Sequence, residues 1–191
     1  MPPEFPPADP LAEAARLYAA GRAADAERQL DALLKARPND AELQFNAAAL
    51  ADRAGRSERA LLGYERVLQL APTALAAWMN LGSLHLRMDA AGEAERCFRR
   101  AAELAPRLPD APLGLGFALL RQDDTEGAAA AFARAVELDP RRPEALANLG
   151  AARLKLGDHQ AAIEAQRRAL ALAPGNPDML CSLGIAELQS G

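Results

Sequence analysis

Asparagines and basic residues recur along this chain at a fixed interval, and their chemistry suits the recognition of a peptide. The asparagines are separated by multiples of 34 residues and are Asn46, Asn80 and Asn148. The basic residues follow one another at 34-residue intervals and are Arg53, Arg87, Arg121 and Lys155. A primary amide both donates and accepts, so it can pair with the N–H and C=O of any extended backbone. A guanidinium can hold a carboxylate through two parallel hydrogen bonds. The pattern therefore predicts a binding surface.

Arrangements that would indicate catalysis or metal binding are not recognisable in the sequence. There is no Ser–His–Asp set at a known spacing, no glycine-rich phosphate loop and no cluster of zinc ligands. His85 falls in a column expected to be buried, and His159 falls where we expect the surface. We therefore predict that the chain is not an enzyme and that it needs no metal and no cofactor.

Composition and charge restrict the partners and the compartment. The formal net charge of −4 does not provide the basic face that nucleic acid requires. No apolar run reaches the ~20 residues of a membrane span, and the N-terminus lacks the basic and apolar regions of a signal peptide. Cys97 and Cys181 are expected to be two unrelated buried thiols. These features predict a cytoplasmic protein whose partner is a protein or peptide, with no nucleic acid and no membrane.

The residue types favour an all-α fold. Half of the chain is apolar but only 4% is aromatic, and alanine and leucine dominate. Both residues have high helix propensity, and alanine lets neighbouring backbones approach closely. A β-sheet protein would contain more Val, Ile, Thr and Tyr.

Five prolines divide the chain into equal intervals and predict a repeat. Each stands 34 residues after the one before: Pro38, Pro72, Pro106, Pro140 and Pro174. With each proline at position 32, a tail of residues 1–6 precedes five repeats and part of a sixth, at 7–40, 41–74, 75–108, 109–142, 143–176 and 177–191. A fixed period of this length indicates stacked supersecondary units.

The repeat columns predict a pair of helices in each unit. Positions 4, 7, 8 and 11 follow helical spacing, which indicates a first helix over positions 1–14, and positions 20, 24, 27 and 28 indicate a second. Position 15 is glycine or aspartate, where the chain leaves the first helix through a left-handed residue. The proline then ends the second helix. In the first unit, Asp9 is the expected N-cap and Pro10 the first helical residue.

These columns resemble the tetratricopeptide repeat (TPR), whose pattern is W-x2-L-G-x2-Y followed by Ala, Phe, Ala and Pro. The third unit carries most of the pattern, as Trp78, Leu81, Gly82, Ala94, Phe98, Ala101 and Pro106. The resemblance covers roughly residues 7–191. It implies an α-α superhelix, a right-handed solenoid with five full repeats and the first helix of a sixth.

In the TPR family, positions 2, 5, 6, 9, 12 and 13 of the first helices line a concave groove. Carried over to this sequence, those positions place the asparagine and basic rows in the groove. The apolar lining expected between the rows is Phe45, Met79, Leu113, Phe117, Leu120 and Leu154. The asparagine row also resembles the ladder in the TPR arm of O-GlcNAc transferase, which implies binding of a substrate backbone. Gly114 interrupts the row here.

Several alternatives remain open at the level of the sequence. Acidic residues at helix starts and basic residues at helix ends also offset the helix macrodipole. The asparagine and basic rows could therefore be solvated scaffold and not a binding surface. The sixth unit stops after one apolar helix containing Leu180, Ile185 and Leu188. That helix could be an imperfect cap or a surface for self-association. It could also mark a fragment of a larger enzyme, whose substrate-recruiting arm precedes a glycosyltransferase or sulfotransferase domain.

Overall fold

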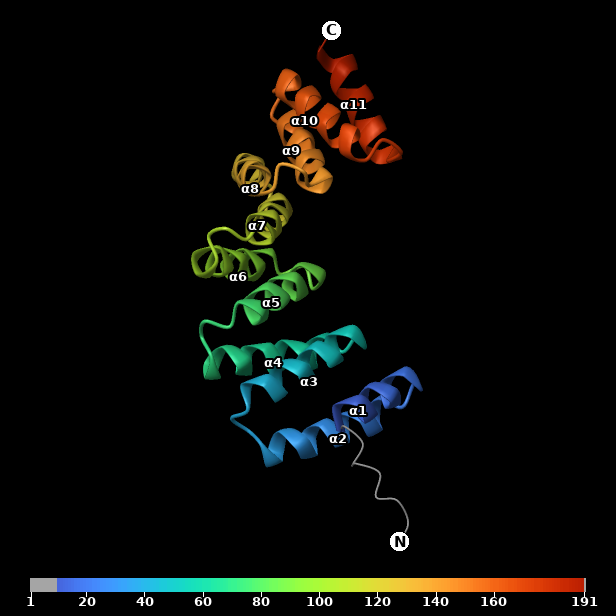
Figure 1. Cartoon of the computed structure of the whole chain (residues 1–191), viewed down its shortest axis with the longest axis vertical. Coiled ribbons are helices and arrows are strands. Elements are labelled where there is room, and N and C mark those ends of the chain that lie inside the picture. The colour runs from blue at the N-terminus through green and yellow to red at the C-terminus, as the bar shows by residue number, and fades with distance from the viewer. Residues whose placement is uncertain (1–9, 191) are drawn as a thin grey trace. The chain divides into compact units, whose positions relative to one another are not determined.

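Residues 10–190 are described by the computed structural model, and every regular element within them is an α-helix. These residues form α1 (Pro10–Ala19), α2 (Ala23–Ala36), α3 (Ala41–Arg53), α4 (Ser57–Leu70), α5 (Leu75–Arg87), α6 (Ala91–Leu104), α7 (Asp110–Arg121), α8 (Thr125–Leu138), α9 (Pro143–Lys155), α10 (His159–Leu172) and α11 (Pro177–Ser190). The all-α prediction is confirmed (Figure 1). The tail, the N-cap predicted at Asp9 and the final Gly191 lie outside the described residues.

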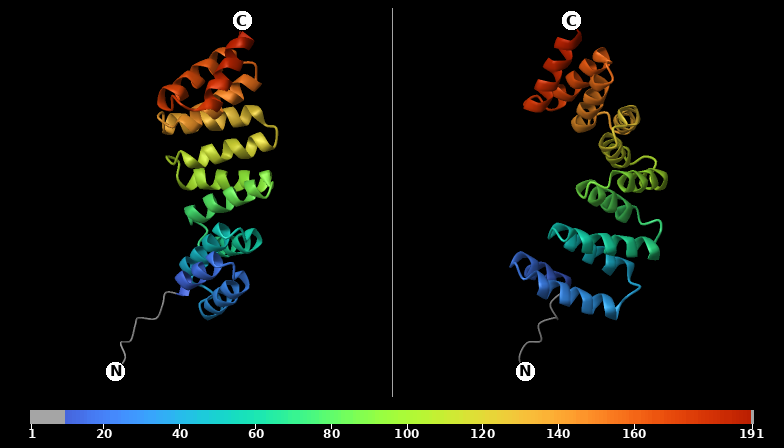
Figure 2. Two further views of the ribbon diagram at one scale, coloured as in Figure 1. Left: turned by 90° about the vertical axis from the view of Figure 1, so that its right-hand side faces the viewer. Right: turned by 180° about the vertical axis from the view of Figure 1, so that it is seen from behind.

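The helix boundaries repeat with the period of the prolines. The second helices α4, α6, α8 and α10 begin 34 residues apart, at Ser57, Ala91, Thr125 and His159. Consecutive helices form antiparallel hairpins, as the turned views in Figure 2 show. The proline at position 32 lies after each second helix because it cannot supply the N–H that the next turn would need.

Left-handed residues end the first helix of each hairpin, as predicted. Position 15 has a positive φ in Gly21 (73°), Gly55 (72°), Asp89 (59°), Asp123 (60°) and Gly157 (80°). Aspartate tolerates this conformation better than most residues with a side chain, which explains why it can replace glycine here. The backbone at position 15 is therefore alike in all five repeats, whether or not a side chain is present.

Helix contacts divide the chain into two compact units, with the boundary between Leu84 and His85 inside α5. We refer to residues 10–84 as the N-terminal unit and to residues 85–190 as the C-terminal unit. In the C-terminal unit each second helix packs closely on the next first helix, as α6 does on α7 and α8 on α9. In the N-terminal unit α2 touches α3 at few positions, so the first hairpin lies more openly against the second.

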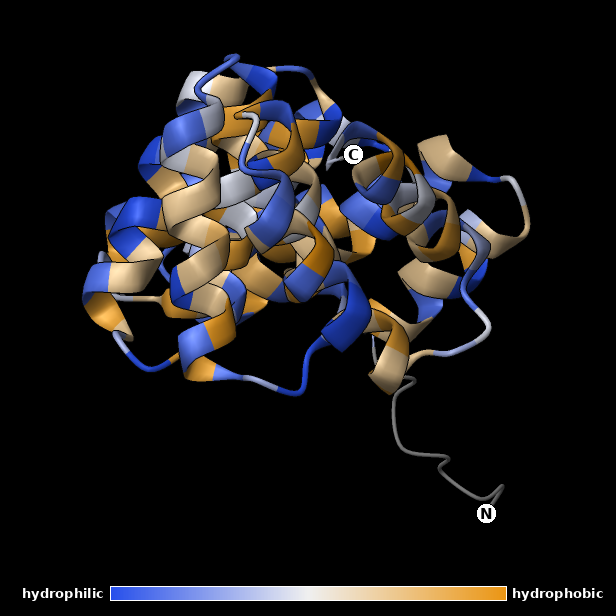
Figure 3. Ribbon diagram, turned by 90° about the horizontal axis from the view of Figure 1, so that it is seen from above, coloured by the Kyte–Doolittle hydropathy of each residue, from blue (hydrophilic) through white to orange (hydrophobic). Residues whose placement is uncertain are grey.

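Close packing within the hairpins depends on small residues opposite large ones. A Cβ at Gly116 would lie 2.4 Å from the ring of Phe132, which is fully buried. Ala26, Ala60, Ala94, Ala128 and Ala162, which share position 20, are also fully buried. Figure 3 shows that the loops are mainly hydrophilic and that the hydrophobic residues are concentrated in the helices.

The expectation of two buried thiols is wrong for one of them. Cys97 is buried in α6, but Cys181 is exposed on α11. Helix α11 packs on α10 through Leu183 and Ala186, which contact Ala162 and Ile163. Cys181 lies on a different face of the helix, so its thiol remains accessible to solvent.

Candidate functional site

A groove on the first helices of the N-terminal unit brings together three of the predicted site residues, Asn46, Arg53 and Asn80. Its volume is about 660 Å³, and α1, α3 and α5 supply nearly all of its lining. The remaining lining residues are Leu11, Ala12, Ala15, Ala49, Leu50, Asp52 and Tyr64. We call this cavity the N-terminal groove.

The groove is hollow where alanines of α1 and α3 line it. Ala12 occupies the repeat position of Asn46, and Ala15 and Ala49 occupy one repeat position on the two helices. Side chains that end at Cβ leave the space between α1 and α3 unfilled. The sparse contact of α2 with α3 keeps that space open.

The asparagine of α5 is held by a tyrosine of the preceding hairpin. Asn80 Nδ2 donates to the hydroxyl oxygen of Tyr64 at 3.2 Å, and Tyr64 is buried at 1% exposure. This bond orients the amide and leaves the carbonyl oxygen of Asn80 as an acceptor. Asn46 is exposed, so both its donor and its acceptor face solvent. The two amides can therefore pair with a backbone that lies along the groove.

A second cavity of about 580 Å³ adjoins the N-terminal groove and shares Ala15, Leu50 and Arg53 with it. Gly21 and Arg56 also line this cavity, which we call the Gly21 cavity. Arg56 Nε donates to Glu27 Oε1 at 2.7 Å, and this hydrogen bond raises the pKa of the Arg56 guanidinium. Arg53, in contrast, is exposed and has no hydrogen-bond or ion-pair partner among residues 10–190.

Tyr18 also lines the Gly21 cavity, and its hydroxyl is buried without a hydrogen-bond partner among the described residues. Burial raises the pKa of Tyr18 because it disfavours the phenolate, and the positive charge of Arg59 partly opposes that effect. The tyrosine therefore stays neutral at physiological pH.

Phe45 and Met79, predicted as apolar lining, are half-buried beside the groove rather than in its wall. The ring of Phe45 packs against Tyr64 with centroids 5.8 Å apart. Ala49 and Asp52 line the groove and were not among the predicted site residues. They occupy positions 9 and 12, which were expected to face the groove, so the repeat register already contained the signal.

The apolar residues predicted for the groove in the C-terminal unit belong largely to the core. Leu113 is buried at 5% exposure in a core cluster with residues of α8 and α9, which is a correction to its predicted role. Phe117 packs edge-on against Phe132, with centroids 5.4 Å apart. Leu120 and Leu154 are half-buried against core clusters.

The three basic residues predicted for the groove in the C-terminal unit already have partners within the chain. Arg121 Nη1 lies 2.9 Å from Asp89 Oδ1, and Lys155 Nζ lies 3.5 Å from Asp123 Oδ1. Arg87 is exposed and also interacts with another group of the chain. Asn148 Nδ2 donates to the carbonyl oxygen of Glu144 at 2.9 Å, one turn earlier in its own helix.

The two histidines differ from their predicted environments. His85 is half-buried rather than part of the core, and it has an interaction partner. His159 is half-buried rather than on the surface, and its Nδ1 is buried without a partner among the described residues. Residues 10–190 contain no group of three or more histidine, cysteine, aspartate or glutamate residues placed to hold a metal ion.

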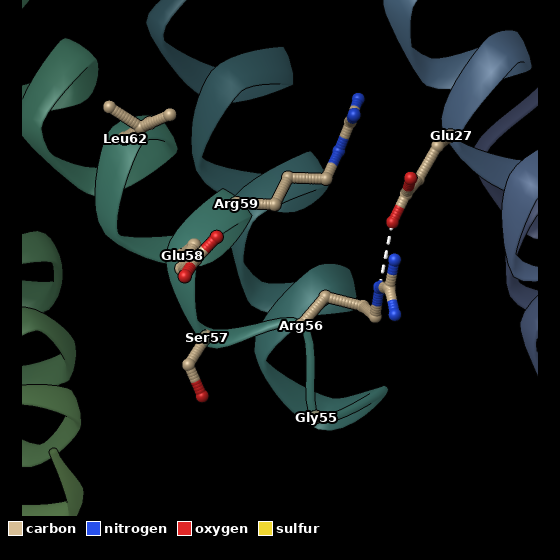
Figure 4. Close-up of a pocket in the computed structure, with 7 residues that line it drawn as sticks. All are labelled: Glu27, Gly55, Arg56, Ser57, Glu58, Arg59 and Leu62. Atoms are coloured by element: carbon tan, nitrogen blue, oxygen red, sulfur yellow. Dashed lines mark hydrogen bonds and ion pairs between the residues drawn. The ribbon is translucent and has the colours of Figure 1, made fainter.

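A third cavity, of about 560 Å³, lies between α2 and α4, and its residues were not predicted from the sequence (Figure 4). Arg56 and Glu27 face each other across it, and Leu62 stands at its edge with 66% of its surface exposed. Arg59 also lines it and pairs with Asp31 at 2.7 Å. Both arginines of this cavity are paired with acids of the chain, whereas Arg53 of the Gly21 cavity is not.

Among the described residues, no helix is both long and apolar enough to cross a membrane. This finding agrees with the absence of a long apolar run in the sequence.

Comparison with known proteins identifies three matching family profiles. The middle TPR-like domain of cilia and flagella-associated protein 70 matches residues 46–148, more than half of the chain. Two tetratricopeptide-repeat profiles match residues 11–74 and 143–176. No sequence among the curated proteins matches significantly.

Solved structures with the same fold include MamA from Desulfovibrio magneticus RS-1, at 23% identity and a TM-score of 0.76 over 88% of this chain and 95% of that one. YrrB, described as a TPR protein with an unusual peptide-binding site, has 24% identity and a TM-score of 0.73 over 84% and 83% of the two chains. A thermophilic TPR protein of Thermus thermophilus has 23% identity and a TM-score of 0.63 over 94% and 97%.

Proposed function

Because the chain belongs to the tetratricopeptide-repeat family, we propose that it is a protein-interaction module whose N-terminal groove binds an extended segment of a protein partner. Repeat proteins of this kind use the surface created by stacking their units to bind partners. The proposal gives the chain a binding role rather than an enzymatic one.

The observation that carries the proposal is the pair of amides in one cavity. Asn46 and Asn80 both line the 660 Å³ N-terminal groove, together with the small side chains of Ala12, Ala15 and Ala49. The alanines leave room for a backbone to approach, and the amides can donate to its carbonyls and accept from its N–H groups. Recognition of this kind depends little on the sequence of the ligand.

The peptide-binding site named in the description of YrrB supports the proposal, since the two chains share their fold. The identity of 24% carries no information on which residues of this chain would contact a peptide. That assignment depends on the groove alone.

An array of unstructured twelve-residue peptides, probed with the labelled protein, tests the proposal. We expect the wild-type chain to bind a subset of peptides and the double variant Asn46→Ala, Asn80→Ala to lose about 10- to 100-fold in affinity. That loss corresponds to two hydrogen-bonding groups of about 0.5–1.5 kcal/mol each. Asn148→Ala is the matched control, because this asparagine belongs to the same row but lies in the C-terminal unit.

Circular dichroism on the same samples separates binding from folding, because Asn80 also bonds to Tyr64. Unchanged peptide binding by a folded double variant would assign the asparagines to the scaffold. Failure of the wild-type chain to bind any peptide would remove the proposed function itself.

Self-association through α11 is a second candidate function, favoured by one observation. Leu180, Ile185 and Leu188 are 53%, 43% and 84% exposed, which is unusual for residues of this size on one helix. Packing against a second copy would bury them. Sedimentation over a range of concentrations tests this, with Leu188→Lys expected to shift any oligomer to monomer. A wild-type chain that stays monomeric throughout would exclude it.

A further inference from the structure

Two ion pairs of the C-terminal unit join neighbouring repeats in the same way. The basic residue at position 13 pairs with the aspartate at position 15 of the preceding repeat, 32 residues earlier. Arg121 pairs with Asp89 in this way, and Lys155 pairs with Asp123. Each aspartate holds the cation from a left-handed backbone, with φ of 59° and 60°.

Arg53 occupies the same position 13, but the residue 32 positions earlier is Gly21. Gly21 has the same left-handed backbone, with φ of 73°, and no side chain. Both residues line the Gly21 cavity of about 580 Å³. Arg53 has no hydrogen-bond or ion-pair partner among residues 10–190, so the cation is present and the carboxylate that pairs with it elsewhere is missing.

We propose that a carboxylate of the bound peptide occupies the Gly21 cavity and pairs with Arg53. The inference deepens the function proposed above and depends on it. The ligand takes over the role that Asp89 and Asp123 perform for Arg121 and Lys155 within the chain.

The surroundings of Arg53 favour this location over the rest of the groove. The Gly21 cavity opens into the N-terminal groove through the shared residues Ala15 and Leu50, so one extended ligand can reach both. Asp52 lines the N-terminal groove but not the Gly21 cavity. The walls of the Gly21 cavity are otherwise rich in alanine, and an arginine can bind a carboxylate through two parallel bonds.

The substitution Gly21→Asp provides a direct test, because it restores the internal partner without altering Arg53. A Cβ at Gly21 meets nothing within 4 Å, and aspartate already adopts this backbone at two equivalent positions of the chain. Gly21→Asn is the matched control, since it has the same shape and backbone tolerance but no charge.

The probe is a peptide from the array, prepared with a free or amidated C-terminus and with its acidic side chains kept or changed to amides. We expect the wild-type chain and Gly21→Asn to prefer a carboxylate form by about tenfold. Gly21→Asp should lose that preference while binding the fully amidated peptide as the wild-type chain does. The amidated forms show whether the C-terminus or a side chain supplies the carboxylate.

Equal binding of all peptide forms by the wild-type chain would overturn the inference and leave the proposed function intact. A carboxylate preference that survives in Gly21→Asp would overturn it as well. Absence of binding by every peptide form would instead remove the proposed function on which the inference depends.

Discussion

The N-terminal and C-terminal units use one repeat but differ in what their groove positions contact. In the N-terminal unit, Tyr64 ends in a hydroxyl that holds the amide of Asn80. In the C-terminal unit, Phe98 occupies the equivalent position, and its ring packs against Gly114, which replaces the asparagine. Between these two pairs of repeats, the amide is present beside the tyrosine hydroxyl and absent beside the phenylalanine ring.

The basic residues of the two units also differ in whether they have a partner within the chain. Arg121 and Lys155 are paired with aspartates of the chain, whereas Arg53 faces a glycine. These two residues of the C-terminal unit thus have partners within the chain, whereas Arg53 of the N-terminal unit has none among residues 10–190. Repetition of a sequence motif does not imply repetition of a binding site.

Restoring the asparagine row in the C-terminal unit should produce the largest effect. A Cβ at Gly114 would lie 2.4 Å from Phe98, whose side chain is buried at 1% exposure. We expect Gly114→Asn to lower the free energy of unfolding by about 2 kcal/mol, as overpacking does in other cores. Urea denaturation followed by circular dichroism measures it.

Gly92→Asn is the control for this substitution, because Gly92 is exposed and its Cβ would meet only Gln122, at 4.0 Å. It should change stability little. If Gly114→Asn were equally neutral, the contact with Phe98 would not be what excludes an asparagine from this repeat.

The sequence predicted the fold well because the signals for it are local and repeated. Proline at position 32 and glycine or aspartate at position 15 act on the backbone of their own residues, so helix ends could be placed from residue types alone. The site was predicted less completely. Leu113 was expected in the groove, yet it is buried in the core. The ion pairs of Arg121 and Lys155 depend on residues 32 positions away, which the helix pattern does not reveal.

A smaller effect is expected at Gln166, which occupies the position of Phe98 and Phe132 in the fifth repeat. Gln166 is buried at 2% exposure and lies against Gly150, with its Oε1 unpaired among the described residues. Gln166→Phe removes that acceptor and adds apolar surface, which we expect to outweigh loss of the bond from Nε2 to the carbonyl oxygen of Ala147 (3.1 Å), with about 1 kcal/mol of added stability in urea denaturation. Gln166→Leu separates loss of the amide from gain of the ring. A Gln166→Phe variant less stable than the wild-type chain would show that the space beside Gly150 does not accept a ring.

The smallest effect is expected from releasing a cation in the C-terminal unit. Asn tolerates the left-handed backbone of Asp123, so Asp123→Asn removes the partner of Lys155 with little strain. The pair is exposed, and its loss should lower the free energy of unfolding by at most about 0.5 kcal/mol in urea denaturation.

The same substitution can be tested for binding in an Arg53→Gln background. The freed ammonium of Lys155 should raise the affinity for the carboxylate peptide by roughly twofold, since an ammonium cannot form the two parallel hydrogen bonds of a guanidinium. A gain as large as that attributed to Arg53 would mean that pairing, rather than the cavity beside Gly21, decides where a carboxylate binds.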